Sequence, residues 1–323
     1  MTEKFKILFI GDIVGRSGRE VVKRFLLDEN KASEYDFVIA NVENASHGFG
    51  LTKKNHDELL ECKINAMTSG NHIWDKRDIL NYINESEALI RPYNYHKDAK
   101  GVGYRIFNDK IIVVNLLGKT FMPPIDCPFC AIEELMNKLK NEMDLSNKIV
   151  FVDFHAEATA EKICFAKFAF ELGVSAVVGT HTHVPTADEK IINNCAYLSD
   201  VGFCGSQNSV IGMEYEGSIK RLITSIPERF EVETSSPYVL NACEIEFSNN
   251  CATSINRISF EYSACEEKES EDWFTYPYNL FWWNAKSWAN RWYCSWVQSW
   301  LHCFNRSRQC FIAQNCSRLY KTK

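Results

Sequence analysis

Short apolar runs alternate with amphipathic segments along the first three-quarters of the chain. Each run has the length of a buried strand, and the segments between them repeat apolar residues at helical spacing, as Val21, Val22, Phe25 and Leu26 do. Strands are expected at 6–11, 36–43, 64–70, 148–155, 174–181 and 195–202, and helices at 17–30, 51–62, 131–143, 159–172 and 214–223. A hairpin closing on Asn108-Asp109 and a final antiparallel region over 229–262 complete the order. This alternation predicts an α/β sandwich.

Polar side chains follow the ends of five predicted strands. These side chains are Asp12, Glu43, Asn44, Asn71, His72, His155, His181 and His183. Ligands of open α/β sheets lie outside the carboxyl ends of strands, so we expect one shared rim to collect them. His181 and His183 alternate in GTHTH, and in an extended chain alternate side chains share a face. Each residue alone is ordinary as a helix cap or turn former, but five coinciding strand ends favour a metal site.

The mixture of donors limits the chemistry of such a site. Carboxylate, amide and imidazole ligands together suit manganese, iron or zinc, whereas magnesium and calcium prefer oxygen alone. Eight candidate side chains exceed what one ion needs, and two ions that share a bridging carboxylate would use them all. Paired ions about 3.5–4 Å apart clamp the attacking and leaving oxygens of a displacement at phosphorus. The pattern therefore predicts phosphoester hydrolysis.

Five longer motifs surround these residues: GDIVGRSGR, NVENASHGFGLT, SGNHIWDK, HAEATAEK and GTHTHVPTAD. Together they resemble the YmdB-like branch of the bacterial metallophosphoesterases, in the calcineurin-like superfamily, from residue 5 to about 260. Most superfamily members have GDxH on the first strand and GDxxD on the second, whereas here Ile13 and Val14 follow Asp12 and the second acid is Glu43. That combination is typical of the branch. The resemblance implies a calcineurin-like sandwich of two mixed β-sheets flanked by helices, and hydrolysis of 2′,3′-cyclic and some 3′,5′-cyclic nucleotide monophosphates.

The same resemblance implies how the side chains divide their roles. One ion would take Asp12, Glu43, Asn44 and His183, and the other would take Glu43, Asn71, His155 and His181. Glu43 would bridge two divalent or trivalent ions, with iron or manganese expected and zinc the alternative. His72 would be the general acid, because an imidazole pKa lies near neutrality. A metal-bridging hydroxide would be the nucleophile.

Several other residues have a functional and an ordinary interpretation side by side. Arg16 and Arg19, after the first strand, are candidates for contact with a phosphate, but a position on the helix surface is the favoured interpretation. His47 is a candidate for contact with substrate, and a solvent-facing loop position explains it at least as well. Asp188 and Asp200 are candidates to accept hydrogen bonds from imidazole N–H groups. A role as surface or capping carboxylates explains them equally well. The contrasting hypothesis for the whole chain is a regulatory metal-binding protein that acts through partner binding, with slow hydrolysis.

Composition narrows the class of protein further. With 323 residues and 46% hydrophobic content the chain can bury a large core, and a net charge of −6 argues against a protein that coats nucleic acid. The first apolar run is too short for a signal peptide, so we expect a cytoplasmic protein that acts on a cyclic nucleotide or another small phosphodiester. We expect assembly into a homo-oligomer only because symmetric assembly is common among such enzymes. The thirteen cysteines form no framework and are interpreted as reduced, inert thiols, including the CPFC pair at 127–130.

The character of the sequence changes after residue 262, where the predicted phosphoesterase domain (1–262) ends. Seven of the eight tryptophans lie at 273–300, and no acid follows Asp272 while seven Lys and Arg accumulate. A helix lying on an anionic membrane surface or a segment that stacks on single-stranded RNA would have this composition. We favour a third interpretation, in which the tail (263–323) is a frameshifted or read-through segment without ordered structure.

Overall fold

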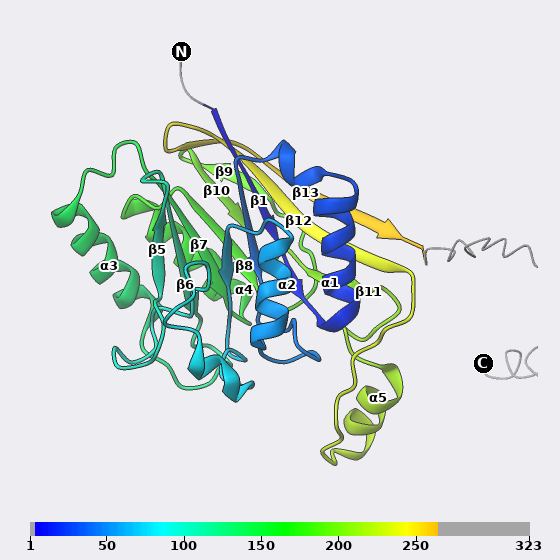
Figure 1. Cartoon of the computed structure of the whole chain (residues 1–323). Coiled ribbons are helices and arrows are strands. Elements are labelled where there is room, and N and C mark those ends of the chain that lie inside the picture. Colours follow the sequence, from blue (N-terminus) through cyan, green and yellow to red (C-terminus); the bar gives the residue numbers. More distant parts are fainter. Residues whose placement is uncertain (1–3, 264–323) are drawn as a thin grey trace, which may run out of the picture. The chain divides into compact units, whose positions relative to one another are not determined.

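Two β-sheets pack face to face in the part of the chain that the computed structural model describes, residues 4–263 (Figure 1). One sheet has the order β2-β11-β12-β1-β3-β4, with β13 paired to β12, and the other has the order β5-β6-β7-β8-β10-β9. The strands of the first are β1 (Lys4–Ile10), β2 (Asp12–Ile13), β3 (Phe37–Asn41), β4 (Ala66–Thr68), β11 (Phe203–Ser206), β12 (Tyr238–Ser248) and β13 (Cys251–Tyr262). Those of the second are β5 (Tyr104–Phe107), β6 (Ile111–Leu117), β7 (Ile149–His155), β8 (Ala176–Thr180), β9 (Lys190–Ile192) and β10 (Cys195–Leu198). Both sheets mix parallel and antiparallel pairs, which confirms the predicted sandwich.

Helices cover the outer face of each sheet. The first sheet packs against α1 (Gly15–Lys23) and α2 (Lys53–Glu61), and the second against α3 (Pro128–Glu142) and α4 (Thr159–Glu171). The predicted helix at 17–30 is α1 followed by a π-helical turn, η1 (Arg24–Asp28). Two short 3₁₀ helices, η2 (Lys31–Glu34) and η3 (Arg77–Asn81), lie in connections, and α5 (Tyr215–Thr224) stands apart from the layers between β11 and β12 (Figure 1).

Strand β1 illustrates why the layers form. Ile7 and Phe9 face the second sheet, and the ring centroid of Phe9 lies 5.1 Å from that of Phe151 in β7. Leu8 and Ile10 point the other way, into the core shared with the helices that cover this sheet. Because successive side chains of a strand alternate in direction, a strand buried on both faces reads as a continuous apolar run.

The parallel strands bring their carboxyl ends to one edge of the sandwich. In the first sheet β1, β3 and β4 run parallel, and in the second β6, β7, β8 and β10 do. The polar motifs follow β1, β3, β4, β7 and β8 in the chain. A ligand-binding site is therefore expected at the edge formed by these strand ends.

Two local predictions had different outcomes. The hairpin turn at Asn108-Asp109 is confirmed, with φ angles of 50° and 51° that suit a type I′ turn between β5 and β6. The final antiparallel region expected over 229–262 is confirmed only from β12 onward, because Val232 makes only an isolated bridge with Met213. Phe230 and Val232 are instead partly buried against a small apolar cluster. Their alternating apolar positions are therefore explained by packing in a loop and need no neighbouring strand.

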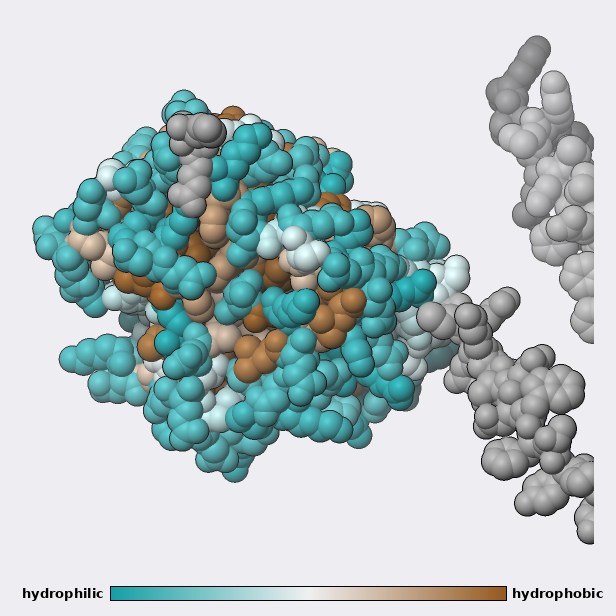
Figure 2. Space-filling model, turned by 45° about the horizontal axis from the view of Figure 1, so that its top comes forward, coloured by the Kyte–Doolittle hydropathy of each residue, from teal (hydrophilic) through white to brown (hydrophobic). Residues whose placement is uncertain are grey.

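The face of the described residues that Figure 2 draws is mostly hydrophilic. Figure 2 shows one face on which hydrophobic side chains form small patches among hydrophilic ones. No helix between residues 4 and 263 is long and apolar enough to cross a membrane. The predictions for the tail concern residues outside the described part of the chain, apart from Ser263.

Candidate metal centre

The strand ends bring all eight predicted polar residues to one region. Asp12 begins β2 directly after β1, Glu43 and Asn44 follow β3, and His155 is the last residue of β7. Asn71 and His72 follow β4, and His181 and His183 follow β8. Asp12, Glu43, Asn44, His155 and His183 are buried, and the other three are half-buried. Buried polar groups in this number require partners that the apolar core does not supply.

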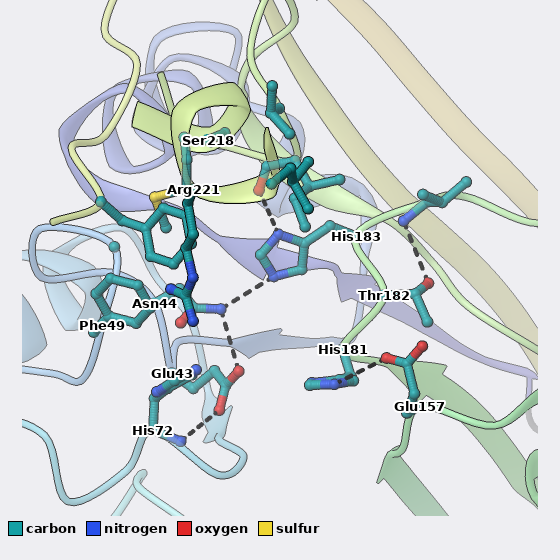
Figure 3. Close-up of a pocket in the computed structure, with 17 residues that line it drawn as sticks. Glu43, Asn44, Phe49, His72, Glu157, His181, Thr182, His183, Ser218 and Arg221 are labelled. Atoms are coloured by element: carbon teal, nitrogen blue, oxygen red, sulfur yellow. Dashed lines mark hydrogen bonds and ion pairs between the residues drawn. The ribbon is translucent and has the colours of Figure 1, made fainter. Parts of the chain in front are cut away.

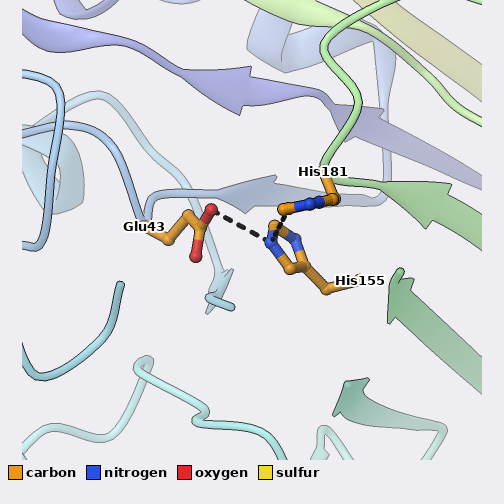
Figure 4. A group of neighbouring side chains, drawn as sticks. All are labelled: Glu43, His155 and His181. Carbon is orange, nitrogen blue, oxygen red and sulfur yellow. Dashed lines mark hydrogen bonds and ion pairs between the residues drawn. The ribbon is translucent and has the colours of Figure 1, made fainter. Parts of the chain in front are cut away.

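The first group of donors surrounds one nitrogen of His155 (Figure 4). His155 Nε2 lies 3.0 Å from Glu43 Oε1, 3.0 Å from His181 Nδ1 and 3.2 Å from Asn71 Oδ1. A ring nitrogen offers one proton or one lone pair, so it cannot satisfy three neighbours. One donor atom each from Glu43, His155 and His181 lies within 4.8 Å of the others. A single cation among these atoms would satisfy all of them.

The second group adjoins the first through Glu43. Asn44 Nδ2 lies 3.2 Å from Glu43 Oε1 and 3.1 Å from His183 Nε2, and Asp12 Oδ1 lies 3.8 Å from His183 Nε2. Asp12 Oδ1 and Asn44 Oδ1 are buried and have no hydrogen-bond partner among residues 4–263. Orphaned buried oxygens are rare in proteins, and a bound ion commonly accounts for them. A 180° turn of the Asn44 amide would bring its oxygen, the atom that metals prefer, toward Glu43 and His183.

Gly70 marks how closely the backbone approaches this group of donors. A β-carbon at this position would collide with Glu43 Oε2 and with His155 Nε2. The space beside these two ligand atoms is therefore kept free by the absence of a side chain. Together with the orphaned oxygens, this shows that the residues present fit a metal centre.

Each histidine of the centre has a second contact that fixes which ring nitrogen carries the proton. His183 Nδ1 donates to the carbonyl oxygen of Ile211 at 2.7 Å, which leaves Nε2 as the free lone pair. His155 Nδ1 lies 2.9 Å from Thr180 Oγ1, which in turn donates to Asp153 Oδ1 at 2.6 Å. Such contacts orient imidazole ligands and raise their basicity.

His181 is oriented in the same way by a residue that the sequence analysis did not single out. Its Nε2 lies 3.2 Å from Glu157 Oε2, so Nδ1 is left to face His155 (Figure 3). Asp188 and Asp200, the carboxylates considered for this role, contact no imidazole in the described part of the chain. Asp188 accepts hydrogen bonds from hydroxyl and backbone N–H groups, and Asp200 is the partner of Lys162. The position of Glu157 two residues after His155 in the HAE motif was the available signal.

The loop after β8 does not have the extended geometry expected for GTHTH. β8 ends at Thr180, and His181 and His183 have φ angles of 100° and 64°, in the left-handed region that non-glycine residues rarely adopt. The extended backbone predicted for this pair is therefore wrong. The two rings reach the centre from a turn, at a backbone cost of about 1–3 kcal/mol for each residue.

A buried ion pair holds this turn in place. Lys162 Nζ on α4 donates to Asp200 Oδ2 at 2.7 Å and to the Thr180 carbonyl at 2.9 Å. Asp200 Oδ2 also accepts the backbone N–H of Thr182 at 3.0 Å. Lys162 and Asp200 are 2% and 1% exposed, so water does not compete for these contacts. The pair fixes the backbone on either side of His181.

The charges of the centre are shifted by burial and by one another. Burial alone would raise the pKa of Glu43 and lower that of His155, but their mutual attraction prevails, so the pKa of Glu43 is lowered and that of His155 is raised to about 9. Burial and the neighbouring His155 lower the pKa of His181 to about 3. Burial also raises the pKa of Asp12. Without a cation, a proton on His155 is what balances Glu43.

His72 lies beside the centre and is held by two neighbours. Its backbone N–H donates to Glu43 Oε2 at 3.0 Å, and its Nδ1 lies 2.9 Å from Asp75 Oδ2. The edge of its ring contacts Phe49 at a centroid distance of 4.8 Å. Asp75 occupies Nδ1, so Nε2 is the nitrogen left to exchange a proton with a bound molecule. His72 is thus in a position suited to a general acid.

A cavity of about 590 Å³ opens beside the centre (Figure 3). This volume is ordinary for a small-molecule site. Its polar side includes Glu43, Asn44, His181 and His183 of the centre together with His72. Its other side is mostly apolar, with Phe49, Met213, Leu222 and Phe230. Arg221 extends from α5 toward Asn44 and Phe49, with its guanidinium 4.7 Å from the ring centroid of Phe230.

Comparisons with known proteins agree with this geometry. A family model described as YmdB-like protein matches residues 8–258. The 2′,3′-cyclic-nucleotide 2′-phosphodiesterase of Bacillus subtilis (strain 168) is 42% identical over 231 residues, which span 70% of this chain and 86% of that protein. The crystal structure of a novel phosphatase from Mycoplasma pneumoniae has a TM-score of 0.74 at 33% identity and covers 81% of this chain and 95% of its own. A hypothetical protein from Thermus thermophilus has a TM-score of 0.73 at 34% identity and covers 80% of this chain and 99% of its own.

Proposed function

The chain belongs to the YmdB-like protein family, and from this premise we propose that it hydrolyses cyclic nucleotides at a centre of two metal ions. It is a metal-dependent phosphoester hydrolase, as its relationship to the Bacillus phosphodiesterase and the Mycoplasma phosphatase indicates. The finer proposal is that 2′,3′-cyclic monophosphates are its substrates, with 3′,5′-cyclic monophosphates as a second class.

The shared position of Glu43 carries the proposal of two ions. Glu43 Oε1 lies 3.0 Å from His155 Nε2 in one group of donors and 3.2 Å from Asn44 Nδ2 in the other. We propose that Glu43 would contribute a ligand to both ions. One ion would be held by Asp12, Glu43, Asn44 and His183, and the other by Glu43, Asn71, His155 and His181. Iron or manganese suits these mixed donors, with zinc the alternative.

Bound ions would supply activation of water and neutralisation of charge on the phosphoryl oxygens. The chain supplies orientation and a proton. Thr180, Glu157 and the Ile211 carbonyl keep the three imidazoles in the required tautomers. Cleavage of the bond between phosphorus and the 2′ oxygen leaves an alkoxide that needs a proton, and His72 Nε2 would donate it. Asp75 holds the His72 ring in the orientation for that transfer.

The substitution His72→Ala tests the enzyme against the regulatory alternative. In an enzyme that needs a general acid, kcat for 2′,3′-cyclic AMP should fall about 10²- to 10⁴-fold while the metal content stays the same. His96→Ala is the matched control, because His96 is an exposed histidine outside the cavity and its loss should not alter kcat. Unchanged turnover in His72→Ala would rule out its role as general acid. A metal-loaded wild type without any turnover would favour the regulatory protein.

A further inference from the structure

A second cavity adjoins the first, and its lining combines four basic side chains with one carboxylate, Glu231. It has a volume of about 430 Å³, and its basic side chains are Arg16, His47, Lys76 and Arg229. We call it the basic cavity. It shares Phe49 and Phe230 with the cavity beside the metal centre, so the two spaces meet at these rings. In a chain with a net charge of −6, a cavity with this lining is a local exception.

The positive charge of the basic cavity is only partly neutralised. Arg16 pairs with Glu20 at 2.6 Å and Arg229 pairs with Glu231 at 3.2 Å, and all four side chains are largely exposed. Lys76 forms no ion pair with a carboxylate among residues 4–263. Exposed pairs of this kind are weak, so both guanidinium groups can exchange a carboxylate for a phosphate at little cost.

The boundary between the cavities adjoins His72, the proposed general acid. The ring centroids of Phe49 and Phe230 are 6.3 Å apart, and Phe49 also contacts the ring of His72. If His72 gives its proton to the ribose oxygen, these rings lie within reach of the base of the same nucleoside. Aromatic side chains bind bases by stacking and tolerate any base, because every base has a π-face. The basic cavity lies beyond them.

We propose that the basic cavity binds a second phosphate, one nucleoside away from the phosphate that is cleaved. In a ribonucleotide with a 2′,3′-cyclic phosphate, the next phosphate is carried by the 5′ oxygen of the same nucleoside. The substrate class is then an oligoribonucleotide whose 3′ end is a 2′,3′-cyclic phosphate. This inference rests on the proposed function, and it extends the substrate beyond a mononucleotide.

Three substrates test the proposal with metal-loaded wild type: adenosine 2′,3′-cyclic phosphate, its 5′-phosphorylated form, and the dinucleotide ApA ending in a 2′,3′-cyclic phosphate. A charge-assisted phosphate contact predicts that kcat/KM for the dinucleotide exceeds that for the unphosphorylated mononucleotide about 10-fold. The ratio should fall toward one in Lys76→Ala and in Arg229→Ala, and should fall with rising salt. Lys140→Ala, on the exposed face of α3, is the control and should keep the ratio.

A wild-type ratio near one, or a ratio that both variants retain, would overturn the proposal. A preference confined to the 5′-phosphorylated mononucleotide would overturn the oligonucleotide assignment. Absence of turnover for all three substrates would instead be a failure of the proposed function. In that case the affinities of metal-loaded His72→Ala for the dinucleotide and the mononucleotide, measured by calorimetry, decide the inference on their own, and equal affinities would refute it.

Discussion

Removal of the buried amine of Lys162 should destabilise the chain and weaken its hold on metal. Lys162→Met keeps the length of the side chain but removes both hydrogen bonds, the one to Asp200 Oδ2 at 2.7 Å and the one to the Thr180 carbonyl at 2.9 Å. Asp200 would then carry a charge at 1% exposure without its counterion. The turn that contains His181 would lose the contacts that stabilise its left-handed backbone.

The size of the effect follows from the burial of the pair. Breaking a buried ion pair on one side costs about 3–5 kcal/mol, because the remaining charge is left in a poor solvent. At about 2–4 °C per kcal/mol for a domain of this size, the melting temperature should fall by about 6–20 °C. Lys162→Met with Asp200→Asn should recover most of this loss, since the neutral amide still accepts the Thr182 N–H and leaves no charge behind.

Urea unfolding of the metal-free protein measures the stability change, and calorimetric titration with manganese measures metal affinity. We expect affinity to fall about 10- to 100-fold in the single variant, the range for contacts that orient ligands. Lys167→Met, an exposed lysine on the same helix, is the control for the substitution itself. A loss below about 1 kcal/mol in Lys162→Met, or a double variant no more stable than the single one, would refute the argument from burial.

Three further predictions concern the centre itself. Gly70→Ala should fold but fail to bind metal, because its β-carbon would collide with Glu43 Oε2 and His155 Nε2; elemental analysis that finds normal metal content would contradict this. The affinity of the metal-free protein for metal should rise up to about 10-fold per pH unit and level off near pH 9. The reason is that an ion needs neutral His155, and the pKa of His155 is raised to about 9. Titrations that give equal affinity at about pH 7 and 9 would argue against this dependence. Glu157→Ala should lower metal affinity about 10- to 100-fold with an unchanged melting curve, because Glu157 orients His181 from a half-exposed position; unchanged affinity in calorimetry would exclude that role.

The convergence of the polar residues could be predicted because it depends on a general property of parallel sheets. Asp12, Glu43 and His155 each follow a strand recognisable from its apolar run, and parallel strands end at the same edge. The turn at Asn108-Asp109 was predictable for a similar reason, since the two residues tolerate positive φ by themselves.

The conformation of the loop after β8 could not be predicted in the same way. The φ angles of His181 and His183 depend on an ion pair whose members, Lys162 and Asp200, are 38 residues apart in the chain. A signal existed in α4, where Lys162 falls on the buried face with Phe165, but a pattern of apolar positions does not identify the partner of a buried lysine. The ring contacts of the histidines and the basic cavity likewise join residues from separate elements and loops, and no periodic pattern in the sequence relates them.

The two sheets contribute different ligands to the proposed ions. Asp12, Glu43 and Asn71 follow strands of one sheet, and His155 and His181 follow strands of the other. A bound ion would therefore link the two sheets of the sandwich at the edge where their strands end. A ligand that binds only the folded state adds stability according to its concentration. The concentration of available metal would therefore also determine how often the two sheets separate locally at this edge. Starvation for metal would then expose the edge to proteases, so unloaded molecules would be removed from the cell sooner than loaded ones.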